Sequence, residues 1–397
     1  MVKGRLRPVD YLAWAQTVPA GARWNLTASG VPDACGPGSV ASGAERERQP
    51  PGWPLLGKLE IEDLCRRDKR PEILAGFLQT VAERYDVAPE CVVPTVGSSG
   101  AITQILFALA RPGDHVIVER PTFEPLHRVP EMLGLSVSRL ERKFEERWEP
   151  LPDRLARLLT PKTRAVILSS LHNPSGVAVD SKTLAAIGEM AARVGAAVLI
   201  DEVYLDFDFH PTGDPDGEPR PWRPAAVAID NGVSWSSTTK CFGFAALRAG
   251  WVVTRDRDAA QAFRLAANYF HVDVPLASLA LATQVMRHAV ELEQLAARAI
   301  APARAIIDRW IAAEPRVAWV PPTAGHTGLV RLPDLTADVA FARHLREAYD
   351  TQVVPGTLFE VPGSVRISFN LPTDELEQAL AHVSAALDDF QAGRAVG

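Results

Sequence analysis

The feature that most constrains this chain is a series of short apolar runs that alternate with helix-like stretches between residues 91 and 254. Stretches such as SKTLAAIGEMAARVG (181–195) have apolar side chains at helical spacing. Because strands connected through helices pair in parallel, this alternation predicts an α/β fold with a mainly parallel sheet covered by helices on both faces. The runs are CVVPTV (91–96), DHVIVER (114–120), LSVSRLE (135–141), RAVILSS (164–170), AAVLIDEVY (196–204), VSWSS (233–237) and RAGWVVT (248–254).

The pattern changes beyond about residue 275, where long helices rich in Ala, Leu and Arg are followed by short strands near TGLVRL and VRISF and a terminal helix. This change predicts a second, smaller α+β domain. Residues 1 to about 50 are expected to be irregular, apart from a short extended segment at RWNLTASGVPD. The expected division is an N-terminal segment that joins the small domain (1–45), a large domain (46–280) and a small C-terminal domain (281–397).

The composition is typical of a soluble globular protein and favours an enzyme that acts on small molecules. The 397 residues are 47% hydrophobic and 23% charged, with a net charge of -6 and no basic stripe, which disfavours nucleic-acid binding. No apolar span reaches the ~20 residues of a membrane helix, and Asp10 and Gln16 interrupt any signal-peptide core. We therefore expect a cytoplasmic protein with no nucleic-acid or membrane partner.

Motif spacing excludes several other chemistries. The four cysteines, at positions 35, 65, 91 and 241, form no CxxC pair, and the nine histidines form no HExxH motif, so no metal site is expected. The sequence has no GxSxG motif and no GxGxxG motif after a strand, which disfavours a serine hydrolase and a Rossmann dehydrogenase.

Polar side chains follow three of the expected strands. RAVILSS leads into Asn173, AAVLI into Asp201 and Tyr204, and VSWSS into Lys240. Because ligands of open parallel sheets bind beyond the carboxyl ends of the strands, an amide, a carboxylate, a phenol and an amine are expected to converge on one rim.

These motifs together resemble the pyridoxal-phosphate-dependent aminotransferases of class I/II, which have fold type I. The resemblance rests on GSSGA (97–101), NPSG (173–176), DEVY (201–204), S-x-x-K-x-x-G (237–243) with an arginine eight residues after the lysine, and VRISF (365–369). They follow the family's order along most of the chain. The resemblance implies a pyridoxal 5'-phosphate (PLP) cofactor, amino-acid and 2-oxo-acid substrates, and a homodimer with active sites near the interface.

The resemblance implies three catalytic residues and one further ring contact. Lys240 would form an imine with the cofactor aldehyde and then remove the Cα proton of the substrate. Asp201 would keep the pyridine nitrogen protonated, because a cationic ring withdraws electrons well. Asn173 and Tyr204 would donate hydrogen bonds to the phenolic oxygen of the ring.

The cofactor phosphate and ring face have their own expected contacts. Ser98 and Ser99 open a helix directly after a strand, so their backbone N–H groups and hydroxyls form a dipole-assisted anion site. By resemblance, Ser237 and Arg248 complete the phosphate site, and Phe123 in RPTFEP stacks on the pyridine ring. Also by resemblance, Arg366 clamps the substrate α-carboxylate, assisted by Asn173 and the backbone near Gly30.

The sequence departs from the family at one place. Many members carry a tyrosine in a Y-x-x-x-G segment shortly before the phosphate helix, and it reaches the partner subunit's phosphate. Here no tyrosine occurs between Tyr11 and Tyr85, and the segment 49–76 is rewritten with charged residues. Trp53 or Lys58 is the hypothesised replacement.

Three functions stay open at this point. The first is an aminotransferase that moves an amino group between an L-amino acid and a 2-oxo acid through the imine on Lys240. The second is another PLP-dependent Cα chemistry, that of a lyase, cyclase or oxidase of specialised amino-acid metabolism. The third is a PLP-binding regulatory or interaction protein that has lost turnover, which the joint presence of Lys240, Asp201 and Arg366 disfavours.

Overall fold

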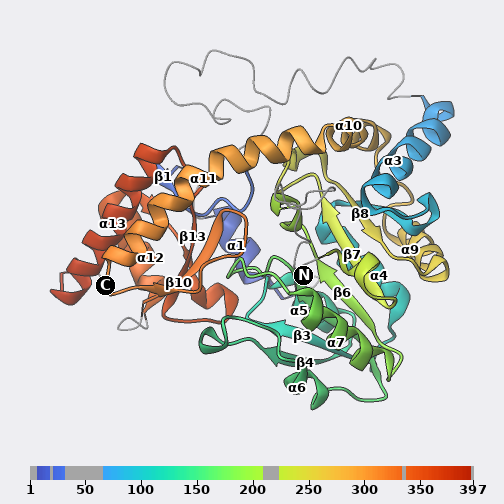
Figure 1. Cartoon of the computed structure of the whole chain (residues 1–397), viewed down its shortest axis with the longest axis horizontal. Coiled ribbons are helices and arrows are strands. Elements are labelled where there is room, and N and C mark those ends of the chain that lie inside the picture. The colour runs from blue at the N-terminus through green and yellow to red at the C-terminus, as the bar shows by residue number, and fades with distance from the viewer. Residues whose placement is uncertain (1–6, 18–20, 32–65, 209–222, 333–336, 395–397) are drawn as a thin grey trace, which may run out of the picture.

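The computed structural model describes residues 7–17, 21–31, 66–208, 223–332 and 337–394. Its larger sheet has seven strands in the order β2-β8-β7-β6-β5-β3-β4 (Figure 1). The strands from β3 to β7 pair in parallel, while β8 runs antiparallel to both β2 and β7, so the predicted mainly parallel sheet is confirmed. These strands are β2 (Val92–Val96), β3 (His115–Arg120), β4 (Ser136–Glu141), β5 (Thr163–Ser169), β6 (Ala197–Asp201), β7 (Gly232–Ser237) and β8 (Ala249–Val253).

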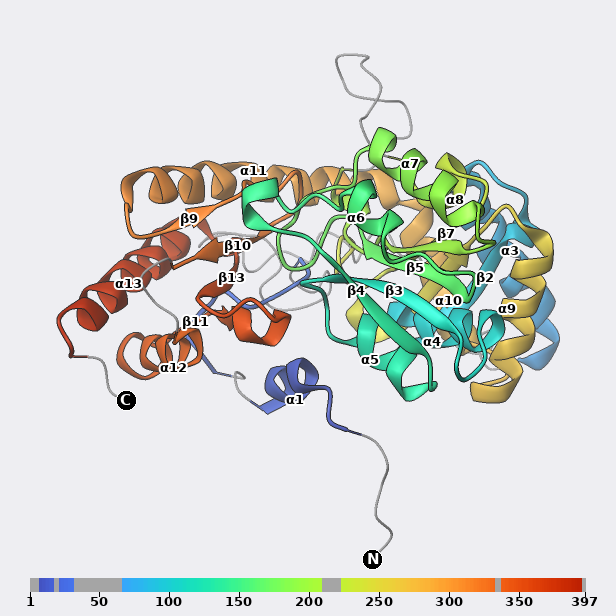
Figure 2. The ribbon, with the colours of Figure 1, turned by 90° about the horizontal axis from the view of Figure 1, so that it is seen from below.

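Helices cover both faces of this sheet, because successive side chains of a buried strand point to opposite sides. In β8, Val252 joins a cluster with the helices of one face, whereas Trp251 and Val253 join a cluster with those of the other. Figure 2 shows the strands between these two helical layers. The first face packs on α4 (Gly97–Leu109), α5 (Pro125–Met132) and α9 (Arg257–Phe270), and the second on α3 (Arg70–Tyr85), α6 (Pro152–Ala156), α7 (Ser181–Ala192), α8 (Ala225–Ala228) and α10 (Leu276–Arg287).

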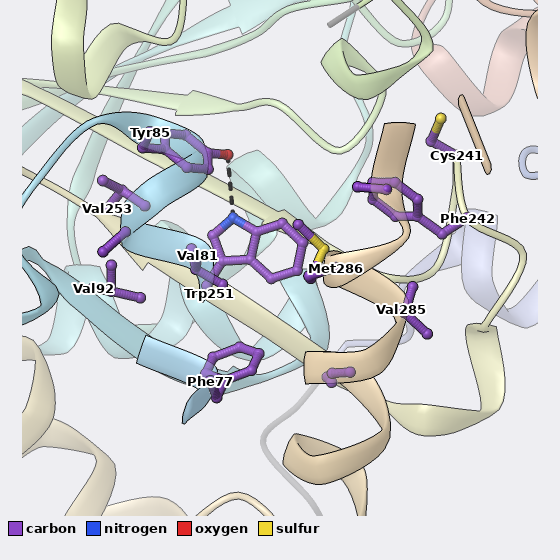
Figure 3. Close-up of a cluster of buried hydrophobic side chains, with 14 of the residues drawn as sticks. Phe77, Val81, Tyr85, Val92, Cys241, Phe242, Trp251, Val253, Val285 and Met286 are labelled. Atoms are coloured by element: carbon purple, nitrogen blue, oxygen red, sulfur yellow. Dashed lines mark hydrogen bonds between the residues drawn. The ribbon is translucent and has the colours of Figure 1, made fainter. Parts of the chain in front are cut away.

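Trp251 is the centre of the cluster under α3 and α10. Its indole Nε1 donates a hydrogen bond of 3.1 Å to the hydroxyl of Tyr85, and Phe77 packs against its ring (Figure 3). The fully buried indole therefore has its polar atom satisfied, as a core tryptophan requires. This packing fixes β8, which contains Gly250 and directly follows Arg248.

A second, smaller sheet is antiparallel, in the order β12-β13-β10-β9. The helix α11 runs from the core of the larger sheet, at Leu292, to the core of the smaller one, at Ile307. Leu26 belongs to the smaller core, and β1 (Trp24–Asn25) pairs with β11 (Thr351–Gln352). The remaining elements here are β9 (Ala318–Trp319), β10 (Thr327–Arg331), β12 (Val354–Pro355), β13 (Ser364–Ser368), α11 (Ala289–Ala313), α12 (Asp338–Tyr349) and α13 (Thr373–Gln391).

The N-terminal region is not wholly irregular, and the expectation for it was wrong at α1 (Asp10–Thr17). This helix has eight residues, too few for a clear apolar period, and it depends on tertiary contacts. The buried ring of Tyr11 packs against Phe359 and Phe123, and its backbone N–H donates to Glu124 Oε2 at 2.7 Å. That carboxylate satisfies one of the free N–H groups at the start of the helix.

No helix in the described ranges combines the length and apolarity needed to cross a membrane. Cys91 and Cys241 are buried free thiols, and burial raises the pKa of Cys241 well above its usual value. Trp53 and Lys58, the hypothesised replacements for the family tyrosine, lie outside the described residues.

Candidate active site

The site lies at the carboxyl ends of β5, β6 and β7. The register pairs Ser169 with Asp201 and Asp201 with Trp235, so these three strands end at nearly the same level. The segments that follow them carry Asn173, Tyr204 and Lys240. The structure therefore brings the four predicted rim residues to one edge of the sheet.

Residues of the N-terminal segment contact both the side chain and the backbone of Lys240. Its Nζ donates a hydrogen bond of 2.6 Å to Ser29 Oγ and lies 5.9 Å from the centre of the Tyr204 ring. Gly30 packs on its backbone, where a Cβ would lie 3.1 Å from the carbonyl oxygen of Thr239. Burial lowers the pKa of the Lys240 amine, and the positive Arg366 lowers it further, while Asp201 opposes the change. A lysine of lowered pKa exchanges protons more readily near neutral pH.

Asp201 ends β6 in a buried position. Its Oδ1 accepts a hydrogen bond of 3.3 Å from the backbone N–H of Val203. Burial raises the pKa of its carboxyl to about 7, and the neighbouring Lys240 counteracts part of this rise. A buried carboxylate gains most from a cationic partner, so the side chain fits a protonated ring nitrogen.

Groups of the kind that bind anions gather where α4 begins. Ser98 and Ser99 lie in the first turn of α4, after Gly97, whose φ is +65°. The guanidinium of Arg248 packs on Gly97 so closely that a Cβ there would lie 2.5 Å from Nη2. Helix N–H groups beside an arginine fork form a strong site for phosphate.

Ser237 reaches the same place through the antiparallel strand β8. It pairs with Gly250, which pairs on its other side with Thr95. A Cβ on Gly250 would lie 2.8 Å from the carbonyl carbon of Gly97 and 2.9 Å from the oxygen of Ser236, so only glycine fits there. This close approach brings the end of β7 near the start of α4.

Arg366, on β13, is fully buried and connects three distant segments. Its Nη1 donates to Asn173 Oδ1 at 3.0 Å, and its Nη2 donates to the carbonyl of Thr27 at 3.0 Å and to the hydroxyl of Tyr11 at 3.2 Å. Its Nε has no hydrogen-bond partner among the described residues. A buried guanidinium without a paired carboxylate is suited to receiving one from a ligand.

Two aromatic side chains border the rim. Phe123, after β3, meets the ring of Tyr11 edge-on at 5.4 Å and is partly buried. Tyr204 stacks on Phe207 at 6.3 Å, and burial raises the pKa of its phenol. The predicted stacking role of Phe123 and ring-oxygen role of Tyr204 stay predictions.

Four residues at this site were not predicted from the sequence. Ser29 and Thr27 lie beside Gly30 in the segment NLTASG, so the motif itself could have indicated them. Tyr11 lies 355 residues from Arg366, and His326 lies in a loop before β10, so no local pattern indicated either.

A parallel sheet whose rim carries a lysine, a buried carboxylate and an anion site at a helix start is the arrangement of a fold type I PLP enzyme. The chain belongs to the aminotransferase class I and II family, whose model matches residues 67–383. The protein is a PLP-dependent transferase.

Three similar proteins illustrate the range of this family. Capreomycidine synthase of Streptomyces vinaceus is 28% identical over 347 residues, which cover 86% of each chain. A PLP-dependent aminotransferase from Streptococcus suis has a TM-score of 0.80 and 26% identity, over 98% of this chain and 99% of that one. The PLP-dependent cyclase OrfR has a TM-score of 0.79 and 25% identity, over 98% of this chain and 99% of that one.

Proposed function

We propose that the protein is an aminotransferase that moves an amino group between an L-amino acid and a 2-oxo acid. The observation that carries this proposal is the Lys240 amine, which bonds Ser29 at 2.6 Å and interacts electrostatically with both Arg366 and Asp201. A reactive amine, a carboxylate-binding arginine and an acid for a ring nitrogen are the groups that transamination needs.

The proposed cofactor contacts follow the geometry of the rim. Ser98, Ser99, Ser237 and Arg248 hold the phosphate, and Asp201 holds the ring nitrogen. PLP supplies an electron-withdrawing ring that stabilises negative charge at the substrate Cα. The ring oxygen is held by Asn173 and Tyr204, and the ring face by Phe123.

The proposed substrate contacts include Arg366 on β13. Arg366 binds the α-carboxylate, and Asn173 and the backbone near Gly30 complete that site. Lys240 carries the proton to and from Cα, since its lowered pKa makes the neutral amine accessible. Asn173 links the proposed cofactor and substrate contacts, since its Oδ1 accepts a hydrogen bond of 3.0 Å from Arg366.

A second candidate is another PLP-dependent Cα chemistry, that of a lyase, cyclase or oxidase. Two similar proteins favour it, one named a synthase and one a cyclase. The residues named above act before these reactions diverge, so they serve either function. A PLP-binding protein without turnover is the third candidate.

Borohydride reduction of the holoprotein, followed by peptide mass spectrometry, tests the proposal. We expect a pyridoxyl group on Lys240 and none in Lys240→Ala. Single amino acids are then added while absorbance and products are recorded. A 2-oxo acid with the pyridoxamine form of the cofactor supports transamination, ammonia or peroxide supports the second candidate, and an unchanged spectrum with every amino acid supports the third.

We also propose a homodimer. Phe107 packs against Tyr269 at 5.5 Å and Phe270 at 5.0 Å, yet Tyr269 is 77% exposed and Phe270 48% exposed. Such a cluster of exposed rings is typical of an interaction surface. The proposed occupant is a second copy of this chain, as the family resemblance implies.

Sedimentation of Tyr269→Glu tests the homodimer. We expect a dimeric wild type and a variant that dissociates at micromolar concentration, because the introduced charge would be buried. Val339→Glu, on the exposed face of α12, is the matched control and should stay dimeric. A monomeric wild type would overturn the proposal.

The cytoplasmic location is likewise a proposal. The two described cysteines are free and unpaired thiols, which suits a reducing compartment. Cell fractionation of the producing organism tests it, with activity expected in the cytosolic fraction.

A further inference from the structure

His326 lies immediately before β10, close to the rim residues. Its ring meets Phe207 edge-on at 4.8 Å, and Phe207 stacks on Tyr204 at 6.3 Å. Its backbone carbonyl accepts a hydrogen bond of 2.8 Å from the N–H of Phe369, just beyond the strand that carries Arg366. These contacts link His326 to the segment that follows β6 and to the residue that follows β13.

The imidazole is buried and its hydrogen bonding is incomplete. His326 is 1% exposed, and neither ring nitrogen completes a hydrogen bond of normal geometry with any described residue, although the ring approaches the backbone of Ala28. Buried His115, in contrast, bonds Thr163 at 2.8 Å and Ser138 at 2.9 Å. Because buried polar groups in folded proteins are nearly always paired, a bound molecule is the expected partner of His326.

The surroundings of His326 determine the protonation state of its imidazole. Burial lowers its pKa to about 3, and the positive charges of Lys240 and Arg366 contribute. The ring is therefore neutral at pH 7 and offers one N–H donor and one acceptor nitrogen. Ala28 lies between Thr27, which accepts from Arg366, and Ser29, which accepts from Lys240.

We propose that His326 is a specificity-determining residue that hydrogen-bonds to an uncharged polar group, a hydroxyl or an amide, on the side chain of the amino-acid substrate. This inference rests on the proposed function, in which Arg366 binds the amino acid and Lys240 carries its Cα proton. The ring approaches the backbone of Ala28, and the flanking Thr27 and Ser29 accept hydrogen bonds from Arg366 and Lys240, so a substrate bound at these two side chains lies near the same segment.

The charges around the ring select against charged side chains. Arg366 repels a cationic side chain near the imidazole, since its positive charge already contributes to the lowered pKa of His326. An anionic side chain would compete with the α-carboxylate for Arg366. A neutral donor or acceptor satisfies the imidazole without either cost, and a site built on such hydrogen bonds rejects the apolar analogue strongly.

The test compares near-isosteric amino acids on the holoprotein, namely threonine with valine and glutamine with methionine. Single-turnover change of the cofactor spectrum gives kcat/KM for each. We expect wild type to prefer one polar member at least about 30-fold. His326→Leu should reduce that preference to within about 3-fold by lowering the polar rate alone, and His326→Gln, which keeps a donor and an acceptor, should restore part of it.

Stability and cofactor content separate this role from a structural one. Because leucine removes two unsatisfied nitrogens, the Tm of cofactor-free His326→Leu should equal or exceed that of wild type. The matched control His115→Leu breaks two satisfied hydrogen bonds, so its Tm should fall while the substrate preference stays.

Each outcome has a defined meaning. The inference is overturned if the preference survives in His326→Leu, or if kcat/KM falls equally for both amino acids of a pair. In either case a pyridoxyl group on Lys240 would still support the proposed function. A holoprotein whose spectrum no amino acid changes, or that gives no pyridoxyl-Lys240, overturns the proposed function and the role of His326 with it.

Discussion

Arg366 donates a hydrogen bond of 3.0 Å to the side-chain oxygen of Asn173, across 193 residues of sequence. This bond joins β13 of the smaller sheet to the segment after β5 of the larger one. The site is therefore complete only when both sheets are packed together. Contacts of the guanidinium with Thr27 and Tyr11 add the N-terminal segment to the same assembly.

Replacing Arg366 with lysine keeps the charge but removes the fork geometry. We expect KM for the amino acid to rise about 30- to 100-fold with little change in cofactor content, since one charge-assisted hydrogen bond contributes about 2–3 kcal/mol. Steady-state kinetics over an amino-acid titration measures this. The control is Arg331→Lys. Arg331 lies on β10 and forms an exposed ion pair with Glu145, so this variant should leave KM unchanged. A variant with normal KM would show that Arg366 is structural.

Tyr11→Phe tests the contribution of α1 to the site, which the sequence did not predict. The ring keeps its packing, but Arg366 loses an acceptor at 3.2 Å, so KM should rise about 3- to 10-fold. The control is Tyr349→Phe, which removes a hydroxyl bonded to Asp389 at 2.6 Å far from the site. That variant should lose stability and keep its KM. Equal KM values for the two variants would argue against a role for α1 in binding.

Asp201 connects the site to the pH dependence of stability. Its pKa in the folded, cofactor-free protein is raised to about 7 from 3.8, so the folded state binds more protons than the unfolded state between these values. Stability from this group is therefore present below pH 4 and is lost as pH rises to about 7. The shift corresponds to at most about 4 kcal/mol.

Asp201→Asn removes this titration. We expect cofactor-free variant and wild type to unfold at similar temperatures at pH 4 and the variant to be the more stable above pH 7. Glu202, whose pKa burial raises to about 8, leaves some pH dependence in both proteins. Thermal unfolding from pH 4 to pH 8 measures the difference. Parallel curves would contradict a raised pKa for Asp201.

Much of this arrangement is local in sequence, which is why it could be predicted. Asp201 ends an apolar strand, and Asn173 and Lys240 each follow one within a few residues, so the strand ends alone predicted that they meet at one rim. The family predicted from these motifs is confirmed by the match over residues 67–383. The expected domain boundaries and the individual roles stay predictions.

The unpredicted residues depend on tertiary contacts. Tyr11 joins the site because Phe359, Phe123 and Glu124 fix a short helix that has no clear period of its own. His326 is recognisable only by its burial and its unpaired nitrogens, and neither property is visible in sequence. Long-range packing therefore positions the residues of the proposed substrate side, while local motifs position those of the proposed cofactor side.

Gly97→Ala tests the anion site. A Cβ at this position would lie 2.5 Å from Arg248 Nη2 and would displace the guanidinium. We expect PLP affinity to fall about 10- to 100-fold, in line with about 1.4–2.7 kcal/mol for a lost phosphate contact, while affinity for pyridoxal, which has no phosphate, changes little. Absorbance titration with each compound measures both affinities.

Gly113→Ala separates this contact from backbone strain. Gly113 has a φ of +90° and no atom within 4 Å of the place where a Cβ would lie, whereas Gly97 has a φ of +65° and meets Arg248. Both variants should lose stability, because alanine is strained at positive φ, but Gly113→Ala should keep the wild-type preference for PLP over pyridoxal. If both variants lose that preference equally, the effect comes from reduced stability, and Arg248 does not bind the phosphate.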